Sequence, residues 1–210
     1  MAETSIAGYE YDDGELNASH GYLLPALKSE LGKLNVPAAE RRAFDLGCGN
    51  GSIANAVSQL GWDVTGIDAS DEGIENAKIT HPHLKLSQGS AYDDLAAAYG
   101  QFPVVYSFEV VEHVYAPRDY ARTLYNLIEP GGTAIISTPY HGYWKNLVMA
   151  ATGKMDAHFT ALWDHGHIKF WSYKTLTVLL EEAGFTDIKF SRVGRIAPLA
   201  KSMVAVAQKK

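Results

Sequence analysis

The chain has 210 residues, a net charge of −6 at pH 7 and ordinary proportions of hydrophobic (47%) and charged (20%) residues. This composition is typical of a globular protein that buries roughly 70% of its unfolded surface, and we expect one domain over residues 1–210. The single cysteine, Cys48, excludes an internal disulfide and a cysteine-cluster zinc site. The acidic balance disfavours a nucleic-acid partner, because such affinity depends on clustered Lys and Arg.

The N-terminal residues MAETSIAGYEYDDGE are acidic, unlike a signal peptide, and no apolar run reaches the length of a bilayer span. We therefore predict a cytoplasmic protein. Over residues 17–34, leucines recur at helical spacing, and Pro25 is expected near the first turn of this helix. Residues 1–35 are predicted to form a cap over the mouth of a ligand site.

A strand followed by a glycine turn is the central motif of the chain. Residues 43–51 read AFDLGCGNG, an apolar run that ends at Asp45 and breaks at Gly47 and Gly49 before a predicted helix. Glycine lets a ligand approach the backbone, and the free N–H groups of a helix start favour electron-rich ligand atoms. Ser52 stands where the dinucleotide fingerprint has its third glycine, and Asp45 would repel a pyrophosphate but attract an ammonium.

A ligand with both a carboxylate and an amine fits this turn, and the methionine end of S-adenosylmethionine has both. The motif D-x-G-C-G-x-G resembles the first motif of the class I S-adenosylmethionine-dependent methyltransferases. The resemblance implies S-adenosylmethionine as the cofactor and a Rossmann-like methyltransferase fold.

Predicted strands and helices alternate after the glycine turn. Strands are predicted over residues 62–68, 81–88, 102–108 and 133–138, and helices over 52–60, 71–78 and 117–129. A helix from Ser172 to Ala183, stopped by Gly184, precedes a terminal antiparallel pair over 186–193 and 203–207. This order predicts an α/β fold with a doubly wound, mostly parallel, seven-stranded sheet. Ligands bind such sheets beyond the carboxyl ends of the strands.

Further cofactor contacts follow from the strand ends. Asp68 ends the second strand, 23 residues after Asp45, where an acid can accept both ribose hydroxyls. The resemblance implies that the loop after the third strand borders the adenine. The ubiquinone-biosynthesis O-methyltransferases, which this chain resembles in motifs described below, have an Arg near the cofactor in their N-terminal helix. Its absence from NASHGY (residues 17–22) leaves His20 or Tyr22 as the contact. The predicted cofactor-binding residues are Tyr22, Asp45, Gly47, Cys48, Gly49, Asp68, Ala69, Ser90, Ala91, Tyr92 and Phe108.

Acidic and histidine residues follow the fourth strand as E-x-x-E-H, which comprises Glu109, Glu112 and His113. The later stretch WDHGHIKFW adds His165 and His167. Carboxylates with imidazoles suit Mg²⁺, Mn²⁺ or Zn²⁺. These motifs resemble the ubiquinone-biosynthesis O-methyltransferases and, in part, the small-RNA 3′-terminal 2′-O-methyltransferases.

The resemblance implies a divalent metal held by Glu109, Glu112, His113 and His165, with His167 as the alternate ligand. Without a metal, Glu112 would cap a helix, and His113 and His165 would act in the acceptor pocket as catalytic bases. Both interpretations stay open at this point.

Residues 140–171 interrupt the alternation with an aromatic-rich insertion, which we interpret as a substrate lid. Its segment YWKNLVM lacks the basic face of a membrane-surface helix, so packing over the site or across a homodimer is favoured over membrane contact. We predict an O-methyltransferase acting on a small hydroxylated or aromatic metabolite. The alternatives are a metal-dependent RNA 2′-O-methyltransferase, a small-molecule N-methyltransferase and a non-catalytic cofactor-binding module.

Overall fold

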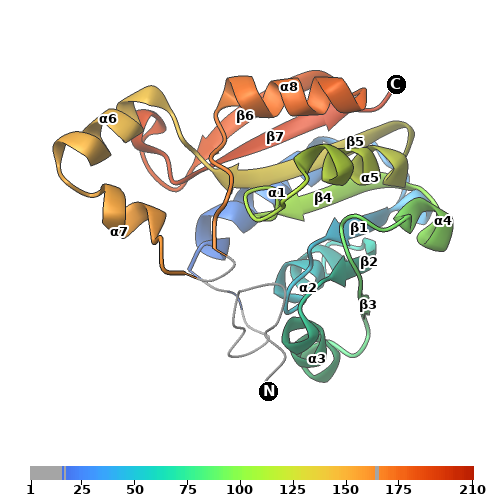
Figure 1. Ribbon diagram of the computed structural model, residues 1–210. Helices are drawn as coiled ribbons and strands as arrows, with labels where there is room; N and C mark the ends of the chain where they lie inside the picture. Colours follow the sequence, from blue (N-terminus) through green and yellow to red (C-terminus); the bar gives the residue numbers. More distant parts are fainter. Residues whose placement is uncertain (1–15, 17, 164–165) are drawn as a thin grey trace.

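The computed structural model describes residues 16, 18–163 and 166–210. Seven strands form one sheet in the order β3-β2-β1-β4-β5-β7-β6 (Figure 1). Their bounds are β1 Arg42–Leu46, β2 Asp63–Asp68, β3 Lys85–Gln88, β4 Phe102–Phe108, β5 Ile128–Pro139, β6 Thr186–Val193 and β7 Ser202–Gln208. The first five strands pair in parallel, and β7 pairs antiparallel with both β5 and β6. The predicted doubly wound α/β sheet with its terminal antiparallel pair is confirmed.

Eight α-helices and two short 3-10 helices accompany the sheet in the part of the chain that the structure describes. The α-helices are α1 His20–Lys33, α2 Ser52–Ser58, α3 Asp71–Thr80, α4 Leu95–Tyr99, α5 Pro117–Leu127, α6 Tyr143–Ala151, α7 Met155–Phe159 and α8 Tyr173–Ala183. The 3-10 helices are η1 Ala38–Glu40 and η2 Ala197–Leu199. No helix among the described residues is both long and apolar enough to cross a membrane.

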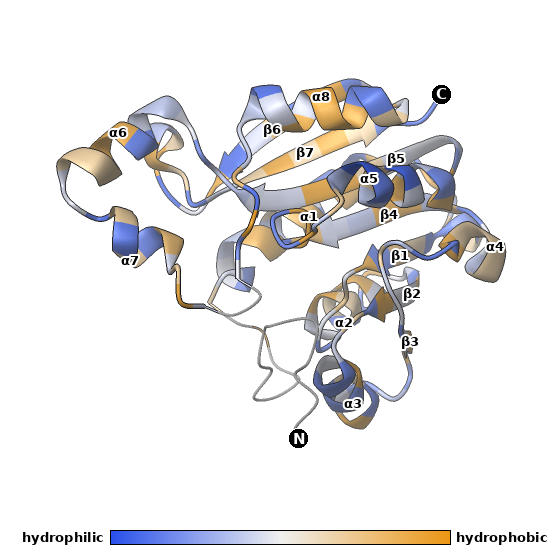
Figure 2. Cartoon of the chain, in the orientation of Figure 1, coloured by the Kyte–Doolittle hydropathy of each residue, from blue (hydrophilic) through white to orange (hydrophobic). Residues whose placement is uncertain are grey.

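Two hydrophobic cores lie on the two faces of the sheet. Alternate strand residues point to opposite faces, so Ala43 belongs to one core and its neighbour Phe44 to the other. Helices α1, α2 and α3 pack their apolar side chains on the Ala43 face, whereas α5 and α8 cover the Phe44 face. Figure 2 shows hydrophobic segments, in orange, alternating with hydrophilic ones, in blue, along α5 and α8. The sheet is therefore buried on both sides, and its carboxyl edge is where a ligand can enter.

Local sequence signals set several helix ends. Ser70 accepts the N–H of Gly73 at 3.1 Å and begins α3. Ser172 and Thr175 form a capping box before α8, and Gly184 ends that helix in the left-handed conformation. Pro117 occupies the first turn of α5, where its missing N–H costs no hydrogen bond.

Several predicted boundaries differ from the structure, and the largest difference is at β5, which begins at Ile128 rather than at Thr133. Helix α2 ends at Ser58, α5 ends at Leu127 and β3 begins only at Lys85. Helix α5 is shorter than predicted because the chain is already extended at Ile128, the first residue of β5. Pro25 lies in the second turn of α1 rather than near its first, with its side chain exposed.

The insertion at residues 140–171 begins and ends at the carboxyl edge of the sheet. It contains α6 and α7, which extend away from the sheet at the left of Figure 1. The N–H of His141 donates to the carbonyl of Trp171 at 3.1 Å, which holds the two ends of the insertion together. The N–H groups of Ile168 and Lys169 both donate to the carbonyl of Glu112, at 2.9 and 3.0 Å. The returning limb of the insertion is thereby fixed beside the loop that follows β4.

Candidate active site

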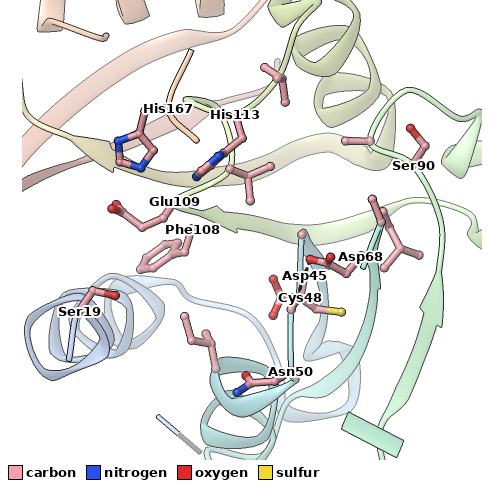
Figure 3. Close-up of a pocket in the computed structure, with 18 of the residues that line it drawn as sticks. Ser19, Asp45, Cys48, Asn50, Asp68, Ser90, Phe108, Glu109, His113 and His167 are labelled. Carbon is pink, nitrogen blue, oxygen red and sulfur yellow. Dashed lines mark hydrogen bonds between the residues drawn. The ribbon is translucent and has the colours of Figure 1, made fainter. Parts of the chain in front are cut away.

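A cavity of about 690 Å³ lies at the carboxyl edge of the sheet (Figure 3). Its walls come from the start of α1, the loops after β1, β2, β3 and β4, and the returning limb of the insertion. The predicted site residues that line it are Asp45, Gly47, Cys48, Gly49, Asp68, Ala69, Ser90, Ala91, Tyr92, Phe108, Glu109, His113 and His167. The topology thus brings together residues that lie more than one hundred positions apart in the chain.

The glycine turn after β1 has a conformation that other residues rarely adopt. Gly47 has φ +91°, and a Cβ at this position would collide with the side chain of Val110. The N–H groups of Gly47 and Cys48 both donate to the carbonyl of Ile67 at 2.9 Å. The turn is consequently tied to the end of β2, and its backbone lies open to the cavity.

Two acids stand at neighbouring strand ends, as the sequence predicts. Asp68 accepts N–H groups from Gly49 and Ser70, each at 2.8 Å. A carboxylate offers about four lone-pair positions, so it can accept further bonds from a ligand's hydroxyl groups. Burial raises the pKa of Asp45 well above its usual range, and its Oδ2 atom has no hydrogen-bond partner among the described residues. A buried carboxylate oxygen of this kind fits a cationic ligand group such as an ammonium.

The loop after β3 borders the same cavity. The N–H of Ser90 donates to Asp93 at 2.8 Å, and the N–H of Tyr92 donates to the Ser90 hydroxyl at 3.2 Å. These bonds orient the loop, which lies on the far side of Asp68 from the glycine turn. The resemblance to the methyltransferases implies that this loop borders the adenine ring of the cofactor.

Tyr22 is the one predicted cofactor residue that is not among the residues lining the cavity, and its contact with the cofactor stays a prediction. The ring of Tyr22 lies 5.2 Å from the Lys201 ammonium. His20 and Leu23 of the same helix line the cavity instead. The Nδ1 atom of His20 is 3.4 Å from the Ser52 hydroxyl, and burial lowers the pKa of His20 to about 4.

Three aromatic rings lie at the end of the cavity that is formed by the loop after β4 and the returning limb of the insertion. The ring of His113 is 4.8 Å from that of His167 and 5.8 Å from that of Trp163, measured between centroids. Both histidines point into the space above Phe108 in Figure 3. Burial lowers the pKa of His167 to about 4, so its imidazole is neutral at pH 7 and can accept a proton or bind a metal.

The predicted four-residue metal set is only partly assembled. Glu112, His113 and His167 each offer a ligand atom, and these atoms lie within 4.8 Å of one another. The Nε2 atom of His167 is 4.0 Å from Glu112 Oε1. His165 lies outside the described residues, and the alternate, His167, takes part.

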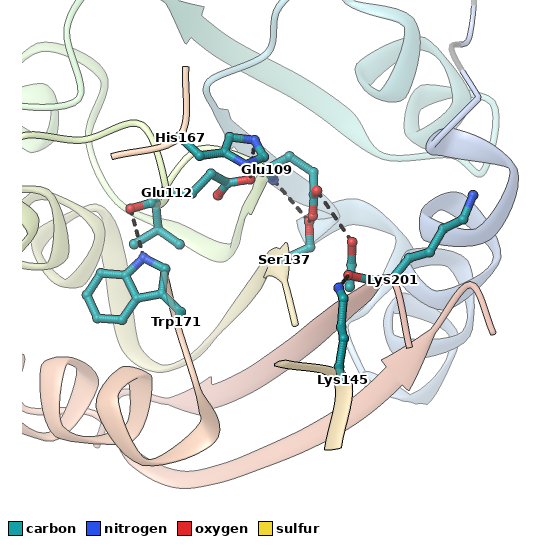
Figure 4. Close-up of polar contacts among 9 residues, drawn as sticks. Glu109, Glu112, Ser137, Lys145, His167, Trp171 and Lys201 are labelled. Atoms are coloured by element: carbon teal, nitrogen blue, oxygen red, sulfur yellow. Dashed lines mark hydrogen bonds and ion pairs between the residues drawn. The ribbon is translucent and has the colours of Figure 1, made fainter. Parts of the chain in front are cut away.

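Glu109 is not a member of this group. Its Oε1 atom accepts the Ser137 hydroxyl at 2.8 Å, and its Oε2 atom accepts the Ser202 hydroxyl at 3.4 Å. Figure 4 shows these contacts turning the Glu109 carboxylate toward β5 and β7. Two serine hydroxyls from distant strands hold the carboxylate in the structure, and the metal role of Glu109 stays a prediction.

Sequence reasoning missed several residues that line the cavity. Val110 and Ile168 have no chemical signature, and Ile168 lies in the returning limb, whose backbone is bonded to the Glu112 carbonyl. Trp163 was expected in the lid, but not at van der Waals range of His113. Asn50 stands within the glycine motif and could have been found from that position alone.

The topology, the glycine turn and the two acids define an S-adenosylmethionine-dependent methyltransferase. The chain belongs to the methyltransferase domain family, whose sequence model matches residues 18–189. Ubiquinone biosynthesis O-methyltransferases of Caulobacter sp. (strain K31) and Ruegeria pomeroyi are each 34% identical to this chain. The matches cover 63% and 72% of this chain and 52% and 62% of the relatives, so the chain spans little more than half of their length.

Solved structures show the same fold at low sequence identity. The methyltransferase domain of bacterial CtHen1 has a TM-score of 0.66 at 21% identity, covering 91% of this chain and all of that domain (100%). A possible histamine N-methyltransferase of Thermotoga maritima has a TM-score of 0.64 at 18% identity, covering 89% of this chain and 87% of that one. The predicted Rossmann-like methyltransferase fold is confirmed.

Proposed function

We propose that the protein transfers a methyl group from S-adenosylmethionine to an oxygen of a small hydroxylated or aromatic metabolite. The observation that carries this proposal is that one cavity joins the cofactor turn to the ring of His113. In this proposal the glycine turn, Asp45, Asp68 and the loop after β3 hold the cofactor. The names of the curated relatives support an oxygen acceptor.

The chemistry requires a positioned and deprotonated nucleophile. The sulfonium leaves as a neutral thioether, so alignment of the acceptor supplies much of the barrier reduction. A phenol with a pKa near 10 costs about 4 kcal/mol to ionise at pH 7. His113 and His167 lie where an imidazole can take that proton, and Trp163 gives the acceptor a flat apolar wall.

A divalent metal at Glu112, His113 and His167 is the second part of the proposal. Burial raises the pKa of Glu112 well above its usual range, and neither of its carboxylate oxygens has a hydrogen-bond partner among the described residues. An unpartnered buried carboxylate beside two imidazoles fits Mg²⁺, Mn²⁺ or Zn²⁺. Such an ion would supply charge stabilisation of an acceptor oxyanion.

Metal binding can be tested without an acceptor. Protein treated with EDTA should gain thermal stability when Mn²⁺ or Zn²⁺ is returned, and E112Q and H167Q should lose this gain. H83Q is the matched control, because His83 is an exposed histidine that does not line the cavity. Equal responses of H167Q and the unchanged protein would favour histidine bases without a metal.

The acceptor class is tested by methyl transfer from radioactive S-adenosylmethionine. We expect label to enter a catechol such as 3,4-dihydroxybenzoate more readily than histamine or a short RNA. Label in histamine alone would replace the proposal with N-methylation. Label in RNA alone would favour the nucleic-acid alternative, which the net charge of −6 disfavours.

A further inference from the structure

Glu109 joins three strands at the edge of the cavity. It follows the last residue of β4 and has φ +55°, which is uncommon for a residue with a side chain. Its N–H donates to both the carbonyl and the hydroxyl oxygen of Ser137 on β5, at 3.2 and 3.0 Å. Its carboxylate accepts hydroxyl groups from Ser137 and from Ser202 on β7. These bonds hold Glu109 in a strained backbone conformation, which indicates that the place of its carboxylate has a role in the protein.

Lys145 is the buried polar residue of the lid helix α6. Most of this helix is exposed: Tyr143 is 73% and Trp144 63% accessible, whereas Lys145 is 8% accessible. The Lys145 ammonium donates to the carbonyl of Lys201 at 3.2 Å. Burying an ammonium costs several kcal/mol unless an opposite charge and hydrogen bonds offset it. A hydrogen bond to one backbone carbonyl is therefore not enough to offset the cost of burying the Lys145 ammonium.

The two charged groups are held by adjacent residues at the start of β7. The Lys201 carbonyl receives Lys145, and the Ser202 hydroxyl binds Glu109. In Figure 4 the Lys145 side chain, from α6, and the Glu109 side chain, from the end of β4, approach the start of β7 from two sides. Burial raises the pKa of Glu109 to about 7 and lowers the pKa of Lys145 to about 8, while the charge of each group favours the ionised form of the other.

Other charged or titratable groups face Lys145 as well. Arg195, from the segment between β6 and β7, disfavours the positive charge of Lys145. His141 and His158 of the lid lie with their rings 5.2 Å apart, and the charge of Lys145 disfavours protonation of both. Among these groups Glu109 is the one acid.

We propose that the Glu109 carboxylate and the Lys145 ammonium form a buried electrostatic link that holds the lid helix α6 against the start of β7. Lys145 is then a positioning residue, and Glu109 serves the lid rather than a metal. The link does not depend on the proposed function. Its test needs no acceptor, so its failure is separate from the failure of the proposed function.

The test is a double-mutant cycle read by hydrogen–deuterium exchange of residues 143–159. K145M removes the charge but keeps most of the side-chain volume, and E109Q keeps the shape of the glutamate. We expect each single variant to raise exchange in this segment at least tenfold, and the double variant to raise it no further. K154M is the control, because Lys154 is an exposed lysine just after α6, and it should leave exchange unchanged.

Three further measurements separate a specific link from general loosening. K145R should restore most of the protection that K145M loses, because it restores the positive charge. K145M should bind S-adenosylhomocysteine within threefold of the unchanged protein, since Lys145 does not line the cavity. E109Q should keep its Mn²⁺ affinity, whereas E112Q should lose it.

Additive effects of K145M and E109Q on exchange would overturn the proposal, as would unchanged exchange in K145M. A tenfold loss of Mn²⁺ affinity in E109Q with unchanged lid exchange would show Glu109 to be a metal ligand instead. If K145M does not fold, the cycle is run with K145Q, and the same two outcomes decide.

Discussion

The Asp68 carboxylate accepts the N–H of Gly49 at 2.8 Å, so the end of β2 holds the glycine turn that follows β1. A second bond, from the N–H of Ser70 at 2.8 Å, fixes the same carboxylate from the start of α3. One side chain thus sets the shape of the cofactor turn and faces the cavity. This double role explains why an acid is needed at this strand end.

The first prediction concerns this acid. D68A should weaken binding of S-adenosylhomocysteine at least ~30-fold, because a hydrogen bond to a charged group is worth about 1.5–3 kcal/mol and the turn also loses its support. Calorimetric titration measures the effect. D63A is the control, because Asp63 lies at the opposite end of β2 and pairs with exposed Lys85. Unchanged affinity in D68A would remove Asp68 from the cofactor site.

The glycine turn gives the second prediction. G47A should lower the free energy of unfolding by about 2–4 kcal/mol, since the added Cβ meets Val110 and a positive φ is unfavourable for alanine. G61A tests the two causes separately, because Gly61 has φ +84° but open space around its Cβ position. It should cost about 1–2 kcal/mol. Equal losses in urea denaturation would show that contact with Val110 contributes nothing.

The third prediction concerns Trp171, the last residue of the insertion. The Trp171 indole N–H donates to the buried carbonyl of Val111 at 3.0 Å. W171F should destabilise the protein by about 1–3 kcal/mol, because the carbonyl loses its donor. W144F, at an exposed position on α6, should change the melting temperature by no more than about 1 °C. A melting temperature of W171F equal to that of W144F would contradict the structure here.

A pH dependence is the fourth prediction. Burial lowers the pKa of His141 from 6.5 to about 4, so between these values the unfolded chain binds a proton that the folded chain does not. Stability should therefore fall as the pH decreases through this window. From pH 7 to pH 5, H141N should lose about 1 kcal/mol less than the unchanged protein, after allowance for partial solvent screening. Equal losses of stability in H141N and the unchanged protein would contradict this account of His141.

Local signals predicted much of the fold correctly. The bounds of β4 follow from a buried apolar run, β6 also has its predicted bounds, and the Ser172 cap and Gly184 stop define α8. These features depend on neighbours within a few positions. The cofactor turn was also predictable, because its glycines and Asp68 are close in sequence.

The contacts that sequence reasoning missed come from distant parts of the chain. The orientation of Glu109 is set by Ser137 and Ser202, which are 28 and 93 residues away. His167 joins Glu112 because the backbone of the next residue, Ile168, is bonded to the Glu112 carbonyl. The ring of Tyr22 lies beside the ammonium of Lys201, 179 positions later. None of these contacts has a periodic or motif-like signal.

The central claim is that the cavity joins a sulfonium cofactor to a small oxygen nucleophile beside His113. The most direct measurement incubates the protein with a cell lysate and S-adenosylmethionine carrying a radioactive methyl group, then separates small molecules from RNA. The account predicts label in the small-molecule fraction, in a product with the acid stability of a methyl ether, and its loss in H113A. Label confined to RNA, or equal labelling by H113A, would contradict it.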